Sequence, residues 1–145
     1  MEKILVTGSS GFIGMHLSLS LLKSGYDIIG LDNMNDYYDP LLKEARLKRL
    51  MKYKNFSFFK GDIADEYFLK HVFIDTKPEK VVNLAAQAGV RYSIENPKTY
   101  INSNVLGFMN ILEQCRHQNI KGLIYASSSS VYGGNKKFHS KNVIM

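Results

Sequence analysis

Short apolar runs alternate along the chain with longer stretches in which apolar residues recur at helical spacing. The apolar runs predict buried strands over residues 3–7, 27–31, 56–59, 80–84 and 123–126. The stretches between them predict a first helix that follows the glycine turn and runs to about residue 24, and further helices over residues 41–53, 65–75 and 97–117. Strands that alternate with helices imply right-handed crossovers and a mostly parallel sheet covered on both faces. The predicted fold class is therefore α/β, a Rossmann-type doubly wound parallel sheet represented by its first five strands with flanking helices.

Residues at the predicted helix ends and along the helix faces add detail. Gly25 is placed to end the first helix, and Asp39 and Pro40 are typical of an N-cap and a first helical position. Helical spacing places apolar residues along one side of the first helix and along one side of the long helix. These sides consist of Ile13, Leu17 and Leu21 in the first helix, and of Ile101, Val105, Phe108, Leu112 and Cys115 in the long one. The apolar side of the long helix is expected to stay partly exposed and to favour self-association.

The composition is that of an ordinary globular protein, with 145 residues of which 45% are hydrophobic. No apolar run has the length of a membrane span, and the first residues break into a glycine turn too early for a signal peptide. Cys115 is the only cysteine, which excludes an intrachain disulfide and fits a reducing compartment. We therefore expect a cytoplasmic domain without a membrane partner.

The net charge of +6 raises the question of nucleic-acid binding. Part of the excess lies in the last ten residues, and most of the rest lies in one basic run with few interleaved aromatics. Such a run is usually the solvated face of a helix, so no nucleic-acid partner is expected. The run comprises Lys43, Arg46, Lys48, Arg49, Lys52 and Lys54. The four histidines show no paired spacing with cysteine or carboxylates, so no metal site is expected.

A glycine-rich turn separates the first predicted strand from the first helix. Gly8, Gly11 and Gly14 stand where a phosphate-binding turn needs a tight bend, a close backbone approach to a diphosphate, and close helix–strand packing. The N–H groups at the start of the helix would then face the phosphates. The alternative interpretation is a tight turn without a ligand.

Two acidic residues follow the next strands. Asp32 ends the second strand, where a carboxylate can accept both hydroxyls of an adenosine ribose and repel a 2′-phosphate, which favours NAD over NADP. Asp62, after the third strand, could accept from the amino group of adenine. Either residue could instead be a plain turn or cap acid.

The turn Thr7-Gly8-x-x-Gly11-x-x-Gly14 resembles the cofactor loop of the extended short-chain dehydrogenases/reductases, which include NAD-dependent nucleotide-sugar epimerases and dehydratases. Further matches are Asp62-Ile63, Asn83-Leu84-Ala85-Ala86, Asn104-x-x-Gly107 and residues 127–133. Residues 32–39 and 88–93 resemble one branch, the UDP-glucuronate 4-epimerases. The resemblance implies a part in polysaccharide biosynthesis, with NAD as cofactor and a UDP-sugar as substrate.

The resemblance also implies roles for individual residues. Small residues after the fourth strand would let the cofactor lie close to the backbone, and the Asn104 amide would anchor loops near it. Ser128 would hydrogen-bond the reacting sugar hydroxyl, and Arg91 could meet a phosphate or the substrate carboxylate. The implied cofactor-binding set is Gly8, Gly11, Phe12, Ile13, Gly14, Asp32, Asn33, Asp62, Ile63, Leu84, Ala85, Ala86, Ala88 and Asn104.

In this family a tyrosine and a lysine in a Tyr-x-x-x-Lys motif transfer the proton, because the nearby ammonium favours the phenolate. The string from Tyr132 to Lys136 has this spacing, but its glycines and asparagine disfavour the helix that would align the pair. We therefore expect residues 1–137 to form an incomplete NAD-binding domain and residues 138–145 a divergent tail, as a truncation or frameshift would leave.

With the catalytic pair and the C-terminal substrate domain missing, the chain alone is expected to be inactive. The leading interpretation is the N-terminal part of a nucleotide-sugar 4-epimerase that converts UDP-glucuronate to UDP-galacturonate, a homodimer when complete. The alternatives are part of a nucleotide-sugar 4,6-dehydratase and a non-catalytic NAD-binding module.

Overall fold

A five-stranded parallel sheet forms the centre of the molecule in the computed structural model, which describes residues 1–128 and 131. The spatial order of the strands is β3-β2-β1-β4-β5, with every neighbouring pair parallel. This order matches the first five strands of the doubly wound order 3-2-1-4-5-6, so the predicted fold class is confirmed. The strands are β1 (Lys3–Thr7), β2 (Asp27–Asp32), β3 (Phe56–Lys60), β4 (Lys80–Asn83) and β5 (Gly122–Tyr125).

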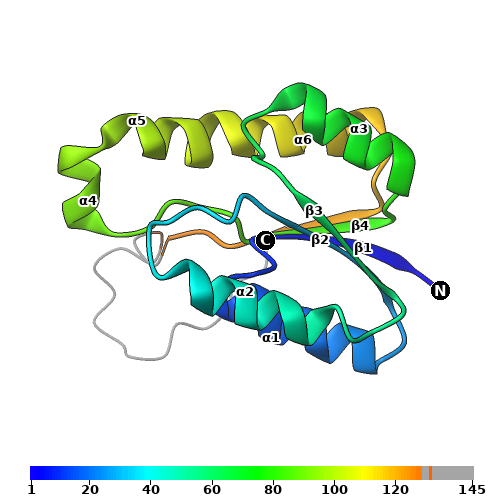
Figure 1. The fold of residues 1–145 in the computed structure, drawn as a ribbon. Helices are drawn as coiled ribbons and strands as arrows, with labels where there is room; N and C mark the ends of the chain where they lie inside the picture. Colours follow the sequence, from blue (N-terminus) through cyan, green and yellow to red (C-terminus); the bar gives the residue numbers. More distant parts are fainter. Residues whose placement is uncertain (129–130, 132–145) are drawn as a thin grey trace, which may run out of the picture.

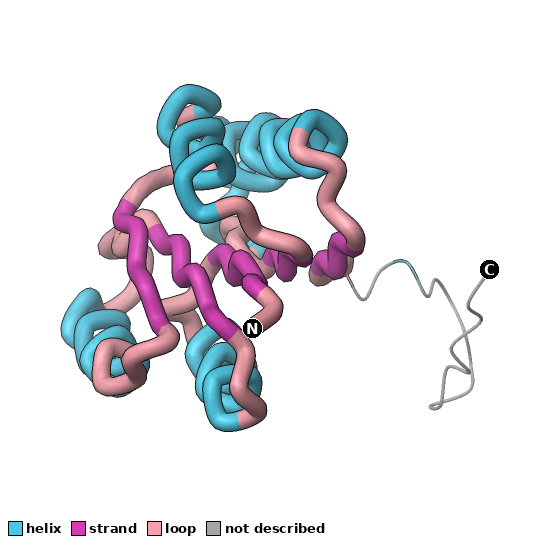
Figure 2. Tube along the Cα trace, turned by 90° about the vertical axis from the view of Figure 1, so that its right-hand side faces the viewer, coloured by secondary structure: helices cyan, strands magenta, loops and turns pink. Residues whose placement is uncertain are grey.

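Helices cover both faces of the sheet (Figures 1 and 2). Helices α1 and α2, in the first two crossovers, lie on one face, and α3 and α6, in the next two, lie on the other, so the chain changes face once, after β3. The predicted long helix is present as α5, a π-helical segment η1 and α6 in succession, whereas the short helix α4 was not predicted. The helices are α1 (Phe12–Lys23), α2 (Pro40–Leu50), α3 (Glu66–Thr76), α4 (Val90–Glu95), α5 (Pro97–Tyr100), η1 (Ile101–Gly107) and α6 (Phe108–His117).

Alternation along the strands divides the core into two layers. On β1, Ile4 and Val6 face the layer under α1 and α2, while Leu5 faces the layer under α3 and α6. Val81 and Val82 of β4 divide in the same way. Both faces of the central strands are therefore apolar, as expected for a parallel sheet with helices on each side.

Helix α1 packs through a side that only partly coincides with the predicted one, since Leu17 and Leu21 pack against the core but Ile13 does not. Its buried residues are Gly14, Met15, Ser18 and Leu22, whereas Ile13 is 65% exposed. A Cβ on Gly14 would lie 2.1 Å from the carbonyl oxygen of Gly8, so the helix starts almost in contact with the preceding turn. This close approach turns the small residues toward the sheet and makes the prediction for Ile13 wrong.

The ends of α1 and α2 agree with the predicted caps. Gly25 has φ +88°, its N–H donates to the carbonyl of Leu22, and the N–H of Tyr26 donates to that of Leu21. These two bonds form a Schellman motif, which satisfies the last carbonyls of α1. At the start of α2, the Asp39 side chain accepts from the N–H of Leu41.

Helix α2 does not present its whole basic run to solvent. Lys48 and Arg49 are exposed, but Arg46 is half-buried and Lys43 is only 5% exposed. The prediction of a solvated face is therefore wrong for Lys43. The physical reason is the position of Lys43 on the side of α2 that faces the end of β2, where the carboxylate of Asp32 lies.

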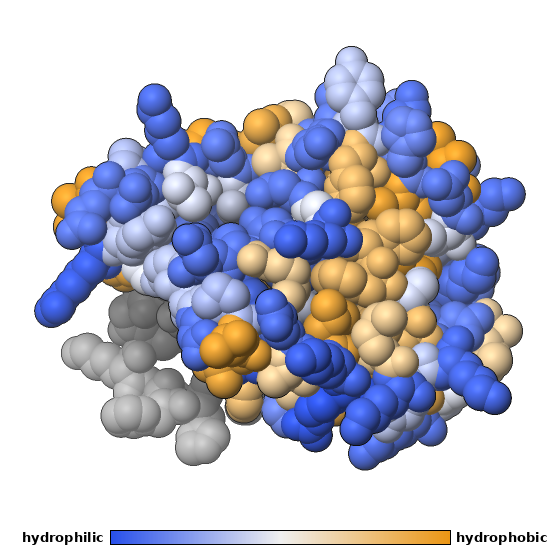
Figure 3. Space-filling view, in the orientation of Figure 1, coloured by the Kyte–Doolittle hydropathy of each residue, from blue (hydrophilic) through white to orange (hydrophobic). Residues whose placement is uncertain are grey.

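The two outer strands of the described sheet are partly open to solvent. On β5, Ile124 and Tyr125 are exposed, as expected for an edge strand. Figure 3 shows an apolar band over β3, between α3 and α2, where the phenylalanines of this strand are half-buried. Within the described part of the chain, no helix has both the length and the apolar character needed to cross a membrane.

Candidate functional site

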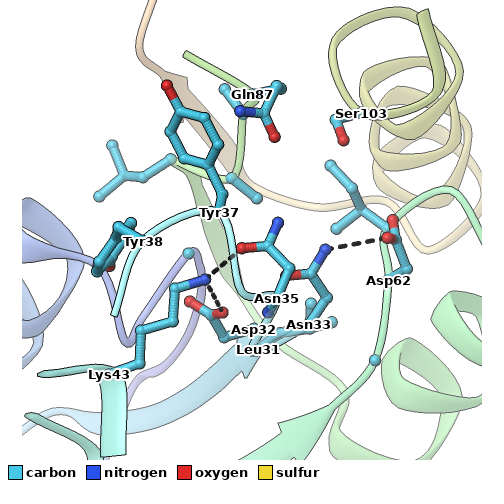
Figure 4. A pocket seen from close by; sticks show the side chains of 17 residues that line it. Leu31, Asp32, Asn33, Asn35, Tyr37, Tyr38, Lys43, Asp62, Gln87 and Ser103 are labelled. Carbon is cyan, nitrogen blue, oxygen red and sulfur yellow. Dashed lines mark hydrogen bonds and ion pairs between the residues drawn. The ribbon is translucent and has the colours of Figure 1, made fainter. Parts of the chain in front are cut away.

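A pocket lies at the carboxyl ends of β1, β2 and β4, where the sheet order changes direction (Figure 4). It brings together nine of the residues predicted from the sequence, whose positions in the chain are far apart. These residues are Gly8, Gly11, Asp32, Asn33, Asp62, Ile63, Leu84, Ala85 and Ala86. In doubly wound sheets this crevice is the usual ligand site.

The glycine turn is built by close backbone contacts. Gly8 has φ +67°, and a Cβ on it would lie 3.0 Å from the backbone of Leu84 and of Ala85. A Cβ on Gly11 would lie 3.0 Å from the carbonyl oxygen of Gly8. The turn therefore requires glycine to bring the start of α1 and the loop after β4 side by side.

Thr7 ties the turn to the loop after β4. Its buried hydroxyl donates to Asn83 Oδ1 over 2.6 Å and accepts from the N–H groups of Leu84 and Ala85, each over 3.1 Å. These three hydrogen bonds hold the backbone at the end of β4, which lines the pocket, next to the end of β1. The sequence showed Thr7 only as part of the glycine motif and gave no sign of this anchoring role.

Asp32 is 6% exposed and is held by the backbone. Its Oδ2 accepts from the N–H of Ser10 over 3.0 Å, and its Oδ1 accepts from the N–H of Met34 over 2.9 Å. A carboxylate oxygen can accept more than one bond, so Asp32 keeps acceptor capacity for hydroxyls in the pocket. Its placement agrees with the predicted contact to a ribose, which stays a prediction.

Asn33 and Asp62 join the loops that follow β2 and β3. Asn33 Nδ2 donates to Asp62 Oδ2 over 3.0 Å, and the N–H of Ala64 donates to Asp62 Oδ1 over 2.9 Å (Figure 4). Ile63 beside them is buried. The predicted contact of Asp62 with an adenine amino group stays a prediction.

The pocket lining also contains eight residues that were not predicted from the sequence as site residues. They come from the end of β2, the loop after it, helix α2, the two loops after β3 and β4, and η1. Five of them could have been suspected because they lie in or next to strings that resemble the UDP-glucuronate 4-epimerases. The eight are Leu31, Asn35, Tyr37, Tyr38, Lys43, Gly61, Gln87 and Ser103.

The loop after β4 is anchored by η1. Asn104 Oδ1 accepts from the N–H of Gln87 over 2.8 Å, and Asn104 Nδ2 donates to the Gln87 carbonyl over 2.9 Å. The expected anchoring of a loop by the Asn104 amide is therefore present. The Ala88 carbonyl accepts from the Tyr100 hydroxyl over 2.8 Å, and Ala88 itself lies outside the pocket lining.

The other predicted residues lie around the pocket rather than in its lining. Phe12 and Ile13 are exposed at the start of α1, and Arg91 is exposed on α4. Ser128 follows β5 and is exposed, and its carbonyl accepts from the N–H of Val131 over 3.2 Å. The string from Tyr132 to Lys136 and the tail 138–145 lie outside the described residues. Within residues 1–128, no three His, Cys, Asp or Glu side chains are grouped as a metal site requires.

These features fit a dinucleotide. Backbone-lined glycines suit a diphosphate, the buried Asp32 suits a ribose, and small residues on the β4 side leave room for a flat ring. The buried hydroxyl of Ser10, in the same turn, has no hydrogen-bond partner in the described structure, so it could serve a ligand or a water. The architecture and the site together define a dinucleotide-binding α/β domain.

Comparison with known families places the chain more closely. Residues 5–142 match the family described as GDP-mannose 4,6 dehydratase. Because this match spans nearly the whole chain, the chain belongs to that family, whose relatives here include nucleotide-sugar epimerases.

Individual relatives are similar over most of this chain and a smaller part of their own length. Protein CapI of Staphylococcus aureus is 62% identical over 133 residues, which are 92% of this chain and 40% of CapI. UDP-glucuronate 4-epimerase 3 of Arabidopsis thaliana is 49% identical over 92% of this chain and 31% of its own. The chain thus spans less than half the length of these relatives.

A solved structure gives the same result in three dimensions. The UDP-glucuronic acid 4-epimerase of Bacillus cereus, crystallised with UDP-glucuronic acid and NAD, superimposes with a TM-score of 0.83. The two are 36% identical, and the match covers 98% of this chain and 45% of the enzyme.

Proposed function

We propose that the chain is the NAD-binding part of a nucleotide-sugar 4-epimerase that converts UDP-glucuronate to UDP-galacturonate in the cytoplasm. The observation that carries this proposal is the buried Asp32 facing a pocket that begins with the glycine turn of Gly8 and Gly11. Relatives named UDP-glucuronate 4-epimerases support the choice of substrate, with identities up to 49%.

Different residues of the pocket would bind different parts of the cofactor. The backbone of the glycine turn and the start of α1 would bind the diphosphate, and Asp32 would accept from the adenosine ribose. Asp62 and Ile63 would border the adenine, while Ala85 and Ala86 would lie along the other half of the molecule. Bound there, NAD supplies a reversible acceptor for the hydride on C4 of the sugar.

Binding of NAD is the first test. We expect isothermal titration of the 145-residue chain to show one NAD site and much weaker binding of NADP. Asp32→Ser should weaken NAD binding about tenfold or more, because a hydrogen bond to a charged group is worth about 1.5–3 kcal/mol. Asp36→Ser, an exposed change in the same loop, should leave the affinity unchanged. Equal affinity in both variants would contradict the assignment.

A chimera tests the enzymatic half of the proposal. We expect residues 1–128 to replace the matching part of the B. cereus enzyme with conversion of UDP-glucuronate retained. In that chimera Ser128→Ala should lower kcat about a hundredfold, because proton transfer by a positioned side chain contributes about 10²–10⁴ in rate. A chimera that binds NAD without any turnover would instead favour a non-catalytic NAD-binding module.

A 4,6-dehydratase is the second candidate, favoured by the description of the matching family. The two candidates differ in product, since a dehydratase would release a 4-keto-6-deoxy sugar and an epimerase a sugar of unchanged mass. We propose further that the 145-residue chain by itself has no turnover, because its one Tyr-x-x-x-Lys string has poor helix formers between Tyr132 and Lys136. Epimerisation by the chain alone, abolished by Tyr132→Phe, would overturn this statement.

A further inference from the structure

Lys43 is a buried lysine of α2 that lies beside the carboxylate of Asp32, the group that would accept hydrogen bonds from the ribose. Lys43 is 5% exposed, and its Nζ donates to Asn35 Oδ1 over 2.6 Å. The same Nζ lies 3.8 Å from Asp32 Oδ1 and 4.9 Å from the centre of the Tyr38 ring. Figure 4 shows the Lys43 side chain reaching the floor of the pocket between Asp32 and Asn35.

A second cation lies next to the first. Arg46, one helical turn further along α2, donates to the Tyr38 hydroxyl over 2.9 Å and to the Ser10 carbonyl over 3.5 Å. Its guanidinium lies 5.6 Å from the centre of the Tyr38 ring. Two cations therefore surround Tyr38, and one of them is paired with Asp32.

The arrangement gives Lys43 a purpose beyond packing. A lysine buried without a partner is costly, so a site of purely structural function would be better filled by an apolar residue. The ammonium of Lys43 contacts Asn35, Asp32 and the ring of Tyr38, all of which line the pocket. If the carboxylate of Asp32 is removed by substitution, the positive charge of Lys43 can therefore interact with a ligand in the pocket.

We propose that Lys43 determines, together with Asp32, which dinucleotide the pocket accepts. Paired with Asp32, it holds the carboxylate at the ribose position and so excludes a 2′-phosphate. When the carboxylate is removed, the same ammonium becomes a ligand for the 2′-phosphate of NADP. This inference rests on the proposed NAD site and adds to it a positioning residue for cofactor specificity.

The electrostatics support both halves of the statement. With Asp32 ionised, the 2′-phosphate of NADP would lie beside a buried carboxylate. Two negative charges in contact at a buried site repel each other strongly. Without Asp32, the charged side chains of the lining are Lys43 and Asp62, with Arg46 one helical turn from Lys43, and a phosphate pairs well with a cation. Arg46 is already bonded to Tyr38 and Ser10, so Lys43 is the cation released by the substitution.

Isothermal titration of NAD and NADP against four forms of the chain tests the proposal. The forms are the natural chain, Asp32→Ser, Lys43→Met and the double variant. We expect Asp32→Ser to bind NADP at least about tenfold more tightly than the natural chain does, and the double variant to lose this gain. Lys43→Met alone should weaken NAD binding without admitting NADP.

Two controls separate specificity from stability. Lys48→Met removes an exposed lysine of the same helix and should change neither affinity. Asp32→Ser with Lys43→Arg keeps the cation, so it should keep the gain for NADP even where Lys43→Met lowers the melting temperature. A purely structural role for Lys43 would change the affinity for NAD and NADP by the same factor.

The outcomes are distinct. A gain for NADP that survives in the double variant would overturn the role of Lys43, and so would the absence of any gain in Asp32→Ser while the natural chain binds NAD. If the natural chain binds neither dinucleotide, the proposed function itself fails and this inference with it. A gain that depends on a cation at position 43 supports the proposal.

Discussion

Gly14 is the residue at which α1 comes closest to the turn after β1. We expect Gly14→Ala to lower the free energy of unfolding by about 1–3 kcal/mol, because its Cβ would lie 2.1 Å from a carbonyl oxygen that cannot move independently. The start of α1 would shift outward, so NAD affinity should fall as well. Urea unfolding and titration of the same variant measure the two effects.

Gly122 provides the matched control for this substitution. It lies on β5, and a Cβ there would meet only Lys80 Cγ at 3.9 Å, which is ordinary contact. Gly122→Ala should therefore change stability by less than about 0.5 kcal/mol. If both alanines had the same effect, the close approach of α1 to the glycine turn would not be the constraint we infer.

Cys115 on α6 gives a prediction at the same scale. Partial burial of its side chain raises the pKa of the thiol to about 11, from an ordinary value of 9.0. At pH 8 the thiolate fraction in the native chain is then about 100-fold smaller than in the unfolded chain, so alkylation should be slower by a similar factor. The stability that the protonated thiol contributes is present below pH 9 and is lost as the pH rises toward 11. Equal alkylation rates with and without guanidinium would contradict the shift.

At the scale of elements, the long helix of η1 and α6 holds the loops that form the pocket. Asn104 bonds the loop after β4, and Asn110 Nδ2 donates to the carbonyls of Ile63 and Ala64 over 3.0 and 3.2 Å. A Cβ on Gly107 would lie 2.5 Å from the Ile63 side chain, so the glycine admits that loop. The motif Asn104-x-x-Gly107 thus has a direct structural reason.

Asn104→Ala tests this arrangement. The substitution removes both bonds to the Gln87 backbone, and we expect a loss of about 1–2 kcal/mol in stability together with weaker NAD binding. Asn102→Ala is the control, because the Asn102 side chain lies on the same segment and has no hydrogen bond among residues 1–128. The two variants are compared by thermal unfolding and by titration with NAD. Similar losses of stability and NAD affinity in both variants would contradict a specific anchoring role for Asn104.

The elements were easier to predict than the faces through which they pack. Each strand was placed to within a residue at either end, because apolar runs on both faces of a parallel sheet leave an unambiguous pattern. Which side of a helix is buried depends on contacts between segments that are distant in the sequence, and the local pattern of apolar residues does not show these contacts. Ile13 is exposed because Gly14 packs on the turn, and Lys43 is buried because Asp32 lies opposite it. The π-helical turns of η1 and the short helix α4 likewise left no periodic signal.

At the scale of the whole molecule, the parallel sheet explains why residues from four loops meet in one pocket. The register pairs Thr7 with Leu31 on one side and with Asn83 on the other, so the ends of three strands lie level. The motifs Gly8–Gly14, Asp32 and Leu84–Ala86 follow these ends directly. About half of the pocket lining could therefore be predicted from the sequence, and Tyr38 lies in a string that resembles the family. Lys43 could not be predicted, because it reaches the pocket from α2.

The exposed apolar side chains of η1 and α6 lead to a prediction for the chain in solution. Ile101, Val105, Met109 and Leu112 are between 43% and 59% exposed. Apolar groups gathered on a surface favour association, so we expect sedimentation velocity to show a species heavier than the 16.5 kDa monomer as concentration rises. Ile101→Lys with Val105→Lys should weaken this association about tenfold or more, at about 1 kcal/mol for each side chain removed from a buried contact. Val90→Lys changes an equally apolar residue that is 85% exposed on α4, and should leave the association intact. A chain that stays monomeric at every concentration, or one that responds to Val90→Lys alone, would show that η1 and α6 are not the associating surface.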